Sequence, residues 1–388
     1  MAMGLRDAGI RRRLGRLPRP TVAGWVVILG TAFVGFLAIR GGEIVPTALF
    51  GLLLAMLGVS MVVPALNLRG VIVTRELPEK VFAGERFGVA ARIGLKGRIT
   101  ESFGIVLEDG VDGPYTRPGY ALALRVAPGE STRVRYHAQI RNRGRHAVTS
   151  CRVSTRFPFG LFEHSVRLDV RSEMLVFPRL GEFDEDPLPG SRFARRMTST
   201  ETVHEKGHEE FRNLREYRSG DSPRLISWKA TARHGDLMVR ELEDDLTKRV
   251  TIFLESRLPE GARRHQELRL ERAISFTATL LHELARRRYF VRLYSLAPDP
   301  AMVEGGRGGR RLDRIMEHLA VLTPTTSGTI EDLVASCRSE VLWTSMPVFV
   351  LPVFDRRTVT AALGRMPPRV EPVIFRADGV WERSVFLG

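Results

Sequence analysis

Residues 21–39 read TVAGWVVILGTAFVGFLAI, and none of these 19 side chains carries a charge. After the short loop RGGE at 40–43, residues 44–68 continue with a further 25 uncharged positions. Because an α-helix rises 1.5 Å per residue, about 20 residues cross the roughly 30 Å hydrocarbon core of a bilayer. Residues 21–68 therefore predict a two-helix transmembrane hairpin. No small-residue cleavage site follows the first segment, which disfavours a secretory signal peptide.

The charges that flank this hairpin predict its orientation. The loop between the spans carries one basic and one acidic residue, Arg40 and Glu43, whereas basic residues gather outside both spans. These are Arg6, Arg11, Arg12, Arg13, Arg16, Arg19, Arg69, Arg75 and Lys80. Since basic flanks stay on the cytoplasmic side, we expect a multi-pass protein of the inner (cytoplasmic) membrane with both termini and the soluble domains in the cytoplasm. Residues 1–20 then form a basic cytoplasmic tail that rests on anionic lipid.

The length of 388 residues allows two or three domains, and the formal net charge is +15. Such a charge suggests nucleic acid or an anionic membrane surface as a partner. Only five of the 59 basic residues are lysines, however, and an arginine bias this uniform is explained as readily by a GC-rich genome. The two cysteines, Cys151 and Cys337, match no disulfide or metal-binding spacing and indicate a reducing compartment.

Residues 69–180 alternate between apolar and polar side chains with a period of two. In RFGVAARIGL (86–95) the apolar residues fall at every second position, and TRVRYHAQI (132–140) repeats the pattern. Strands of this kind bury one face and expose the other to water. Turn residues separate the strands, in APGES at 127–131 and NRGRH at 142–146. The pattern predicts an antiparallel, Ig-like β-sandwich over residues 69–180.

Residues 250–388 change to alternating strands and helices. The run RVTIFLES from Arg249 is continuously apolar, as in a strand buried on both faces, and a helical spacing of apolar residues follows over 264–288. Further strands are expected at 290–296, 347–354 and 370–375, with helices between them. Alternating βα units predict a doubly wound α/β domain with a parallel sheet.

The connecting segment 181–249 contains the most distinctive stretch, GHEEFRNLREYRSGDSPRLISWKATARHGDLMVRELEDD at 207–245. It resembles the bacterial "domain of unknown function 58" family, whose pattern is close to G-x-x-E-F-x-x-L-R-E-Y-x-x-G-D-x-x-R-x-I-D-W-K-x-x-A-R. The matching residues are Gly207, Glu210, Phe211, Leu214, Arg215, Glu216, Tyr217, Gly220, Asp221, Arg224, Ile226, Trp228, Lys229, Ala232 and Arg233. Ser227 departs from the family, which usually has Asp there.

The resemblance covers nearly the whole chain and implies an architecture and a partner. Members of that family have the same order of parts: two spans, a sandwich that ends in a stretch like RFPFGLF (Arg156–Phe162), the signature, and a von Willebrand factor A-like C-terminal domain. They are commonly encoded with MoxR-type AAA+ ATPases and are regarded as accessory factors. The resemblance therefore implies a MoxR-type ATPase as partner and no defined enzymatic activity.

The signature has two interpretations. In the first it is structural: Phe211, Tyr217 and Trp228 fill a core, and the charged residues pair with one another, as buried charges must. In the second it is a docking surface for a partner protein. The residues that would carry docking are Glu210, Phe211, Arg215, Glu216, Tyr217, Gly220, Asp221, Arg224, Trp228, Lys229 and Arg233.

HEKGH at 204–208 matches the His-Glu-x-x-His signature of zinc metallopeptidases. That site needs a helix whose i and i+4 histidines share one face, and such a helix normally packs in a core. Here the neighbouring residues are polar almost throughout, and Gly207 would cost that helix roughly 1 kcal/mol. Because no third ligand stands at a convincing spacing, we interpret the match as coincidental.

Other catalytic patterns are missing from the sequence. No stretch matches the phosphate-binding G-x-x-x-x-G-K-[ST] loop. A von Willebrand A domain would bind Mg²⁺ through Asp-x-Ser-x-Ser after its first strand, but the equivalent positions here hold Glu255, Arg257 and Pro259. Arg257 would repel the ion and Pro259 has no side-chain oxygen, so we expect this metal site to be lost. We predict no catalytic residue, cofactor or metal.

These observations favour a non-enzymatic, membrane-anchored cytoplasmic adaptor that works with a MoxR-type AAA+ ATPase in the assembly or maturation of partner proteins. Two alternatives remain open. A membrane-bound zinc metallopeptidase would use His204, Glu205 and His208. An arginine-rich nucleic-acid-binding protein would lose affinity steeply as salt rises, because binding releases counterions.

The orientation of the hairpin yields a first prediction. A reporter fused after Gly388 should give a cytoplasmic signal, because arginine-rich flanks bracket both spans. The paired measurement is the activity of a reporter that works only in the cytoplasm beside one that works only in the periplasm. A periplasmic signal would place the soluble domains outside and remove a cytoplasmic ATPase as partner.

Overall fold

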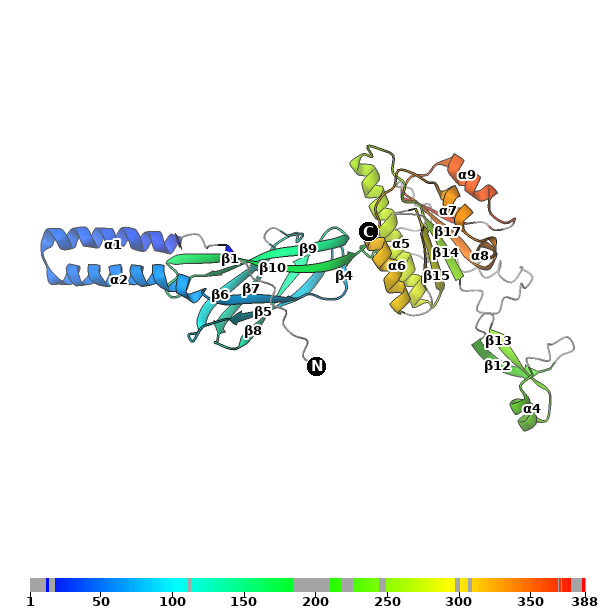
Figure 1. Ribbon diagram of the computed structural model, residues 1–388, viewed down its shortest axis with the longest axis horizontal. Coiled ribbons are helices and arrows are strands. Elements are labelled where there is room, and N and C mark those ends of the chain that lie inside the picture. The colour runs from blue at the N-terminus through cyan, green and yellow to red at the C-terminus, as the bar shows by residue number, and fades with distance from the viewer. Residues whose placement is uncertain are drawn as a thin grey trace. The chain divides into compact units, whose positions relative to one another are not determined.

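The computed structural model describes residues 12–13, 18–110, 113–183, 210–217, 226–243, 249–296, 301–305, 309–368, 370, 372–377 and 386–387. The chain forms two compact units, Met1–Pro178 and Arg179–Gly388. Each unit has its own architecture, and the elements of each are labelled in Figure 1. HEKGH at 204–208 lies outside the described residues.

The first unit begins with two long antiparallel helices, α1 (Val22–Gly41) and α2 (Ile44–Asn67), which lie side by side (Figure 1). Both are long and apolar enough to cross a membrane. The α1 helix starts at Thr21, whose hydroxyl accepts a hydrogen bond from the N–H of Gly24, and ends at Gly42 in the left-handed conformation. The hairpin predicted over residues 21–68 is therefore present.

The two helices pack closely through a small residue. A Cβ added to Gly35 of α1 would lie 2.6 Å from the ring of Phe50 in α2, so glycine lets that ring approach the α1 backbone. The outer faces of the helices stay apolar and exposed. Val22, Ile39 and Ile44 are each at least 85 % exposed, although all three are β-branched hydrocarbons.

The rest of the first unit consists of two sheets. The smaller has the order β3-β5-β8, and the larger has the order β1-β10-β9-β6-β7, with β2 and β4 also paired to β10. Except for the parallel pair β4–β10, neighbouring strands are antiparallel. The strands are β1 (Arg12–Arg13), β2 (Arg19–Pro20), β3 (Val71–Glu76), β4 (Val81–Phe82), β5 (Arg86–Leu95), β6 (Ser102–Asp109), β7 (Gly119–Val126), β8 (Ser131–Gln139), β9 (Gly144–Thr155) and β10 (Phe162–Phe177).

The alternation of apolar and polar residues in the sequence matches the alternation of buried and exposed side chains along the strands. In β5, Phe87, Val89, Ala91 and Ile93 are buried, and the residues between them lie toward the other face. Buried residues of both sheets form one hydrophobic core, to which β5 and β8 contribute from one sheet and β6, β9 and β10 from the other. Antiparallel strands are thus confirmed, whereas the Ig-like assignment stays a prediction.

A buried ion pair crosses this core. Arg75 of β3 binds Asp109 of β6 through two hydrogen bonds, Nε–Oδ2 at 2.8 Å and Nη2–Oδ1 at 2.5 Å. Their side chains are 1 % and 0 % exposed. Tyr136 of β8 donates to the same carboxylate, and Arg75 also donates to the carbonyls of Val148 and Val170. Burial alone would lower the pKa of Arg75, but the hydrogen bond and charge of Asp109 outweigh it and the pKa is raised.

The helical hairpin is hydrogen-bonded to one end of the sheets. The buried side chain of Asn67, the last residue of α2, donates to the carbonyl of Phe103 at 2.7 Å and accepts from its N–H at 2.9 Å. It also donates to the hydroxyl of Thr155 at 3.1 Å. At the start of α1, the N–H of Thr21 donates to the carbonyl of Leu161 at 2.8 Å. Both helix ends therefore join the sheets at the same edge.

The second unit contains a five-stranded sheet in the order β16-β15-β14-β17-β18. β15, β14, β17 and β18 are parallel, but β16 pairs antiparallel with β15, so the wholly parallel sheet expected from the sequence is wrong at this edge. β16 is five residues long, too short for its period to show, and an antiparallel neighbour needs no crossover helix. The strands are β14 (Arg249–Leu254), β15 (Phe290–Ser295), β16 (Ala301–Gly305), β17 (Met346–Leu351) and β18 (Val373–Arg376).

Helices cover both faces of this sheet (Figure 1). One face packs on α7, α8 and α9 through a core that includes Phe253, Phe349 and Leu333. The other carries α5 and α6. The α/β layering follows the predicted alternation, and the von Willebrand factor A-like assignment stays a prediction. The helices are α5 (Arg264–Arg286), α6 (Gly309–Val321), α7 (Ile330–Ser336), α8 (Ser339–Thr344) and α9 (Arg356–Gly364).

Two short strands join the two ends of the second unit. β11 (Glu182–Phe183) pairs antiparallel with β19 (Phe386–Leu387). The ring of Phe183 meets that of Phe276 in α5 edge to face, with centroids 5.4 Å apart, and the N–H of Gly181 donates to Thr279 of the same helix. The segment that enters this unit is thereby fixed to α5.

The buried ion pair yields a second prediction. Asp109→Asn leaves Arg75 charged and buried without a counterion, a change that costs about 3–5 kcal/mol. Cys151 is buried in the same core and Cys337 is buried in the second unit, so their thiols report the opening of the two units separately. The variant should raise the labelling rate of Cys151 by roughly 100-fold or more, and Cys337 should react as before.

The matched control removes an exposed ion pair. Glu101→Gln breaks the surface pair between Glu101 and Arg125, which solvent screens. Labelling of Cys151 should then match the unchanged chain. Equal rates for Asp109→Asn and Glu101→Gln would contradict a stabilising role of the buried pair.

Candidate functional site

The signature segment folds into a β-hairpin and a short helix. β12 (Glu210–Glu216) pairs antiparallel with β13 (Met238–Glu243), and α4 (Trp228–His234) lies between them in the chain. Two hydrogen bonds tie α4 to the hairpin: Ser227 N–H to the Met238 carbonyl and Met238 N–H to the Thr231 hydroxyl. A third bond, from Tyr217 N–H to the Leu237 carbonyl, extends the hairpin itself. These bonds fix the backbone of a segment whose apolar residues follow neither a helical nor a strand periodicity.

The inner side of this small fold is formed by small or β-branched residues. Ser227, Ala230 and Val239 are buried, and Gly235 ends α4 in the left-handed conformation. Ser227, which stands where the resembling family usually has Asp, precedes the first residue of α4.

The aromatic residues of the signature lie outside rather than inside. Trp228 is 68 % exposed and Tyr217 is 37 % exposed. The structural interpretation, in which both fill a core, is therefore wrong for Trp228 and for much of the Tyr217 ring. Lys229 and Arg233 are exposed as well, one helical turn apart on α4. A tryptophan and two cations are thus exposed on the same short helix.

The remaining signature residues are placed less completely. Glu216 is exposed at the end of β12. Glu210, Phe211 and Arg215 belong to β12 by their backbone, but their side chains lie outside the description. Gly207, Gly220, Asp221 and Arg224 lie outside the described residues altogether. The turn that Asp221 and Arg224 flank in the sequence therefore stays a prediction.

A second group of polar residues follows β14, at the carboxyl edge of the α/β sheet. Glu255 and Ser256 are 4 % and 0 % exposed, and Arg257 forms a parallel bridge with Thr325. The N–H of Thr325 donates to the carbonyl of Ser256 at 3.1 Å, which holds this loop against the segment after α6. Asp355, at the N-terminal end of α9, interacts electrostatically with Glu255.

The carboxyl group of Glu255 is held near its point of titration. Burial raises its pKa to about 7, Arg257 acts in the opposite direction, and Asp355 adds to the increase. The Arg257 Nε lies 3.6 Å from Glu255 Oε1, too far for a hydrogen bond. Neither Glu255 Oε1 nor the Ser256 hydroxyl has a hydrogen-bond partner among the described residues. This edge can therefore hold or release one proton near neutral pH.

The described part of the chain contains no group of three or more His, Cys, Asp or Glu residues that could hold a metal ion. This includes the Glu255 edge, where Arg257 occupies one of the positions that a metal-binding loop would use. The donor set therefore does not fit Mg²⁺. The tertiary structure gives Glu255 a pKa near neutral pH through burial, and not a place in a metal-binding site.

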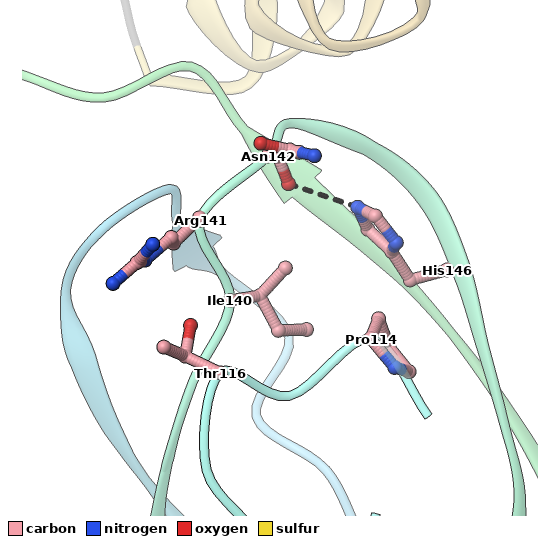
Figure 2. Close-up of a pocket in the computed structure, with 6 residues that line it drawn as sticks. All are labelled: Pro114, Thr116, Ile140, Arg141, Asn142 and His146. Atoms are coloured by element: carbon pink, nitrogen blue, oxygen red, sulfur yellow. Dashed lines mark hydrogen bonds between the residues drawn. The ribbon is translucent and has the colours of Figure 1, made fainter. Parts of the chain in front are cut away.

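A shallow pocket of about 450 Å³ lies on the first unit (Figure 2). Its lining comes from the segment before β7, from the turn between β8 and β9, and from the start of β9, and includes Thr116, Ile140, Arg141 and His146. The ring of His146 interacts with the backbone carbonyl of Asn142 at 2.8 Å, within the pocket wall. The register of β9 and β10, which pairs Gly144 with Val176 and Thr155 with His164, puts this pocket at the end of the sheets remote from the helical hairpin.

Comparisons with known proteins support the resemblance that the signature suggested. Residues 213–340, from β12 into α8, match the family described as "Protein of unknown function DUF58". The chain is also similar to "Uncharacterized protein YeaD" of Bacillus subtilis (strain 168), with 24 % identity over 317 residues. The aligned residues make up 77 % of this chain and 75 % of that protein. The family resemblance is thereby confirmed, and neither description names an activity.

Glu255 yields a third prediction. Its pKa is raised from 4.5 in an exposed glutamate to about 7, so the folded state binds the proton more tightly than the unfolded state. The contribution of protonated Glu255 to the free energy of unfolding is therefore complete below about pH 4.5 and is lost as pH rises through about 7. Glu255→Gln should therefore match the unchanged chain at low pH and exceed its stability by about 3 kcal/mol above pH 7.

The measurement is the labelling rate of Cys337, which is buried in the same unit, at a series of pH values under conditions corrected for thiol ionisation. Glu260→Gln changes an exposed glutamate five residues away and serves as the control. A difference between Glu255→Gln and the unchanged chain that is constant with pH would contradict the prediction.

Proposed function

We propose that this chain is a non-enzymatic, membrane-anchored adaptor whose signature segment docks a cytoplasmic protein, and that the partner is a MoxR-type AAA+ ATPase. The observation that carries the proposal is the exposure of Trp228, together with that of Lys229 and Arg233, on α4. The partner's identity comes from the family resemblance. The proposed task is the assembly or maturation of further proteins.

The anchor is supported by the surfaces of α1 and α2. Each large apolar side chain left in water forgoes about 1.5–3 kcal/mol of burial, and both helices expose many of them, among them Val26, Leu29, Phe33 and Leu52. A bilayer removes this penalty, and a helix satisfies its own backbone hydrogen bonds inside it. We therefore assign the hairpin to the inner membrane, with the soluble units in the cytoplasm as the flanking arginines predict.

Docking through α4 is supported by the kinds of residue that it exposes. Tryptophan and arginine are enriched among the few residues that carry most of the binding energy of an interface. A free tryptophan surface in water is unfavourable, and α4 holds Trp228 there by hydrogen bonds to the hairpin rather than by packing its ring. The two exposed cations of the same helix suit a partner surface that carries carboxylates.

The alternatives are separated by their own measurements. A zinc metallopeptidase predicts stoichiometric zinc that is lost when His204 or His208 is replaced. A nucleic-acid-binding protein predicts affinity that falls steeply with salt. Absence of both results would leave the adaptor as the supported function.

The docking surface yields a fourth prediction. Trp228→Ala should weaken association with the ATPase by roughly 30-fold, the loss expected when a central interface tryptophan is removed. Association is measured by co-purification from native membranes with nucleotide trapped on the ATPase, followed by titration with the purified partner. The labelling rates of Cys151 and Cys337 should not change, because Trp228 packs in neither core.

Trp343→Ala provides the matched control. Trp343 is also exposed, at 43 %, but it lies on α8, outside the signature. This variant should bind the ATPase as the unchanged chain does. Equal binding by both variants, or recovery of no ATPase with the unchanged chain, would contradict the docking proposal.

A further inference from the structure

We propose that the β-sheet part of the first unit touches the bilayer directly, through a membrane collar made of Ile99, Phe157 and Phe159. These residues belong to two turns, 96–100 between β5 and β6 and 156–161 between β9 and β10. Both turns are hydrogen-bonded to the ends of the helices. The collar would contact the interfacial layer of an anionic phospholipid bilayer. This inference rests on the membrane anchor proposed above and adds a second kind of contact to it.

The turn 156–161 is fixed against the first turn of α1. The hydroxyl of Thr21 donates to the carbonyl of Gly160 at 2.8 Å, and the N–H of Thr21 donates to the carbonyl of Leu161 at the same distance. A Cβ added to Gly24 would lie 2.1 Å from the Leu161 carbonyl oxygen. Glycine at position 24 therefore lets residues 156–161 lie directly on the helix backbone, within the first helical turn of α1.

The length of α1 places this contact at the edge of the hydrocarbon. Its 20 residues span about 30 Å, which equals the thickness of the hydrocarbon core, so its first turn lies at the boundary. Gly24 is three residues beyond Thr21, or roughly 4.5 Å along the axis. The polar layer of a bilayer is itself about 5–7 Å deep on each side. A turn that contacts both Thr21 and Gly24 therefore lies at the boundary between the polar layer and the hydrocarbon.

The turn 96–100 meets the other helix end. Nη1 of Arg98 donates to the carbonyls of Leu66 and Asn67 at 2.9 and 3.0 Å, and so neutralises the carboxyl end of α2. Ile99, the next residue, is 97 % exposed. An isoleucine held at the end of a spanning helix, with almost no protein contact, is placed where lipid would cover it.

Both turns expose apolar side chains next to polar and charged ones: Ile99 lies near Lys96 and Thr100, and Phe157 and Phe159 lie near Arg156. Phe157 stacks on Phe103 with ring centroids 5.2 Å apart and remains 37 % exposed, and Phe159 is 55 % exposed. Arg19 and Arg69, which flank the two spans, are exposed at the same edge. Apolar rings with neighbouring cations match the interface of a bilayer that contains anionic headgroups.

The opposite end of the same sheets has a different chemistry. There the pocket of Figure 2 is lined by Thr116, Arg141, Asn142 and His146 together with two apolar residues. The apolar turns therefore occur at the end that the helices join, as a lipid contact requires.

The test measures the depth of spin labels in the full chain reconstituted into liposomes of phosphatidylcholine and phosphatidylglycerol. Labels are attached at Phe159→Cys and, on the other turn, at Ile99→Cys, which disturbs little packing. Each should collide several-fold more with oxygen dissolved in the lipid, and several-fold less with a water-soluble nickel chelate, than a label at Tyr120→Cys. Tyr120 is exposed on β7 about 20 Å along the sheet from Val126, which pairs with Ser102 at the helix-proximal edge.

A label at Phe33→Cys, midway along α1, separates the collar from the anchor. Protection at 33, 99 and 159 with an aqueous label at 120 supports the collar. Protection at 33 with aqueous labels at 99 and 159 overturns the collar and leaves the anchor standing. Aqueous labels at all four positions overturn the anchor and the collar together. The parent chain, whose two cysteines are buried, gives the labelling background.

Discussion

The first unit depends on the buried ion pair between Arg75 and Asp109. Both charges have left water, so each must be satisfied within the core, and the guanidinium does this with one carboxylate and two backbone carbonyls. Its partners lie on β6, β9 and β10 of the larger sheet, while Arg75 itself and Tyr136 come from the smaller sheet. One side chain thus fixes how the two sheets face each other. Purely apolar packing would leave that arrangement less specific.

The relation of the sheets to the helices follows from this arrangement. Because β6 and β9 are held in register, Phe103 and Thr155 lie together at one edge and both bind Asn67. Thr21 joins the same edge through the turn that precedes β10. The hairpin is therefore attached at both of its ends rather than through a flexible linker. A hairpin attached in this way fixes the orientation of the sheets relative to the two helices.

The two candidate sites of the second unit differ in what they offer. The signature hairpin displays Trp228 and two cations from a short helix, residue types that are common in protein recognition. Glu255 is the reverse, a buried carboxyl group near its titration point with no ligand set around it among the described residues. The proposed docking role uses the first property, and the second makes the stability of the unit vary with pH.

The sequence by itself determined the elements whose signal is local. Uncharged runs of sufficient length predicted α1 and α2, alternation predicted strands such as β5, and a continuous apolar run predicted β14, because each pattern reports which faces of one segment are buried. The signature indicated a resemblance to the family that residues 213–340 match, without any knowledge of the fold. Only the tertiary structure decided which distant residues meet: Arg75 with Asp109, Asn67 with Phe103, and β16 antiparallel to β15. It also decided that Trp228 is exposed and Glu255 buried, because burial depends on neighbours that no local period encodes.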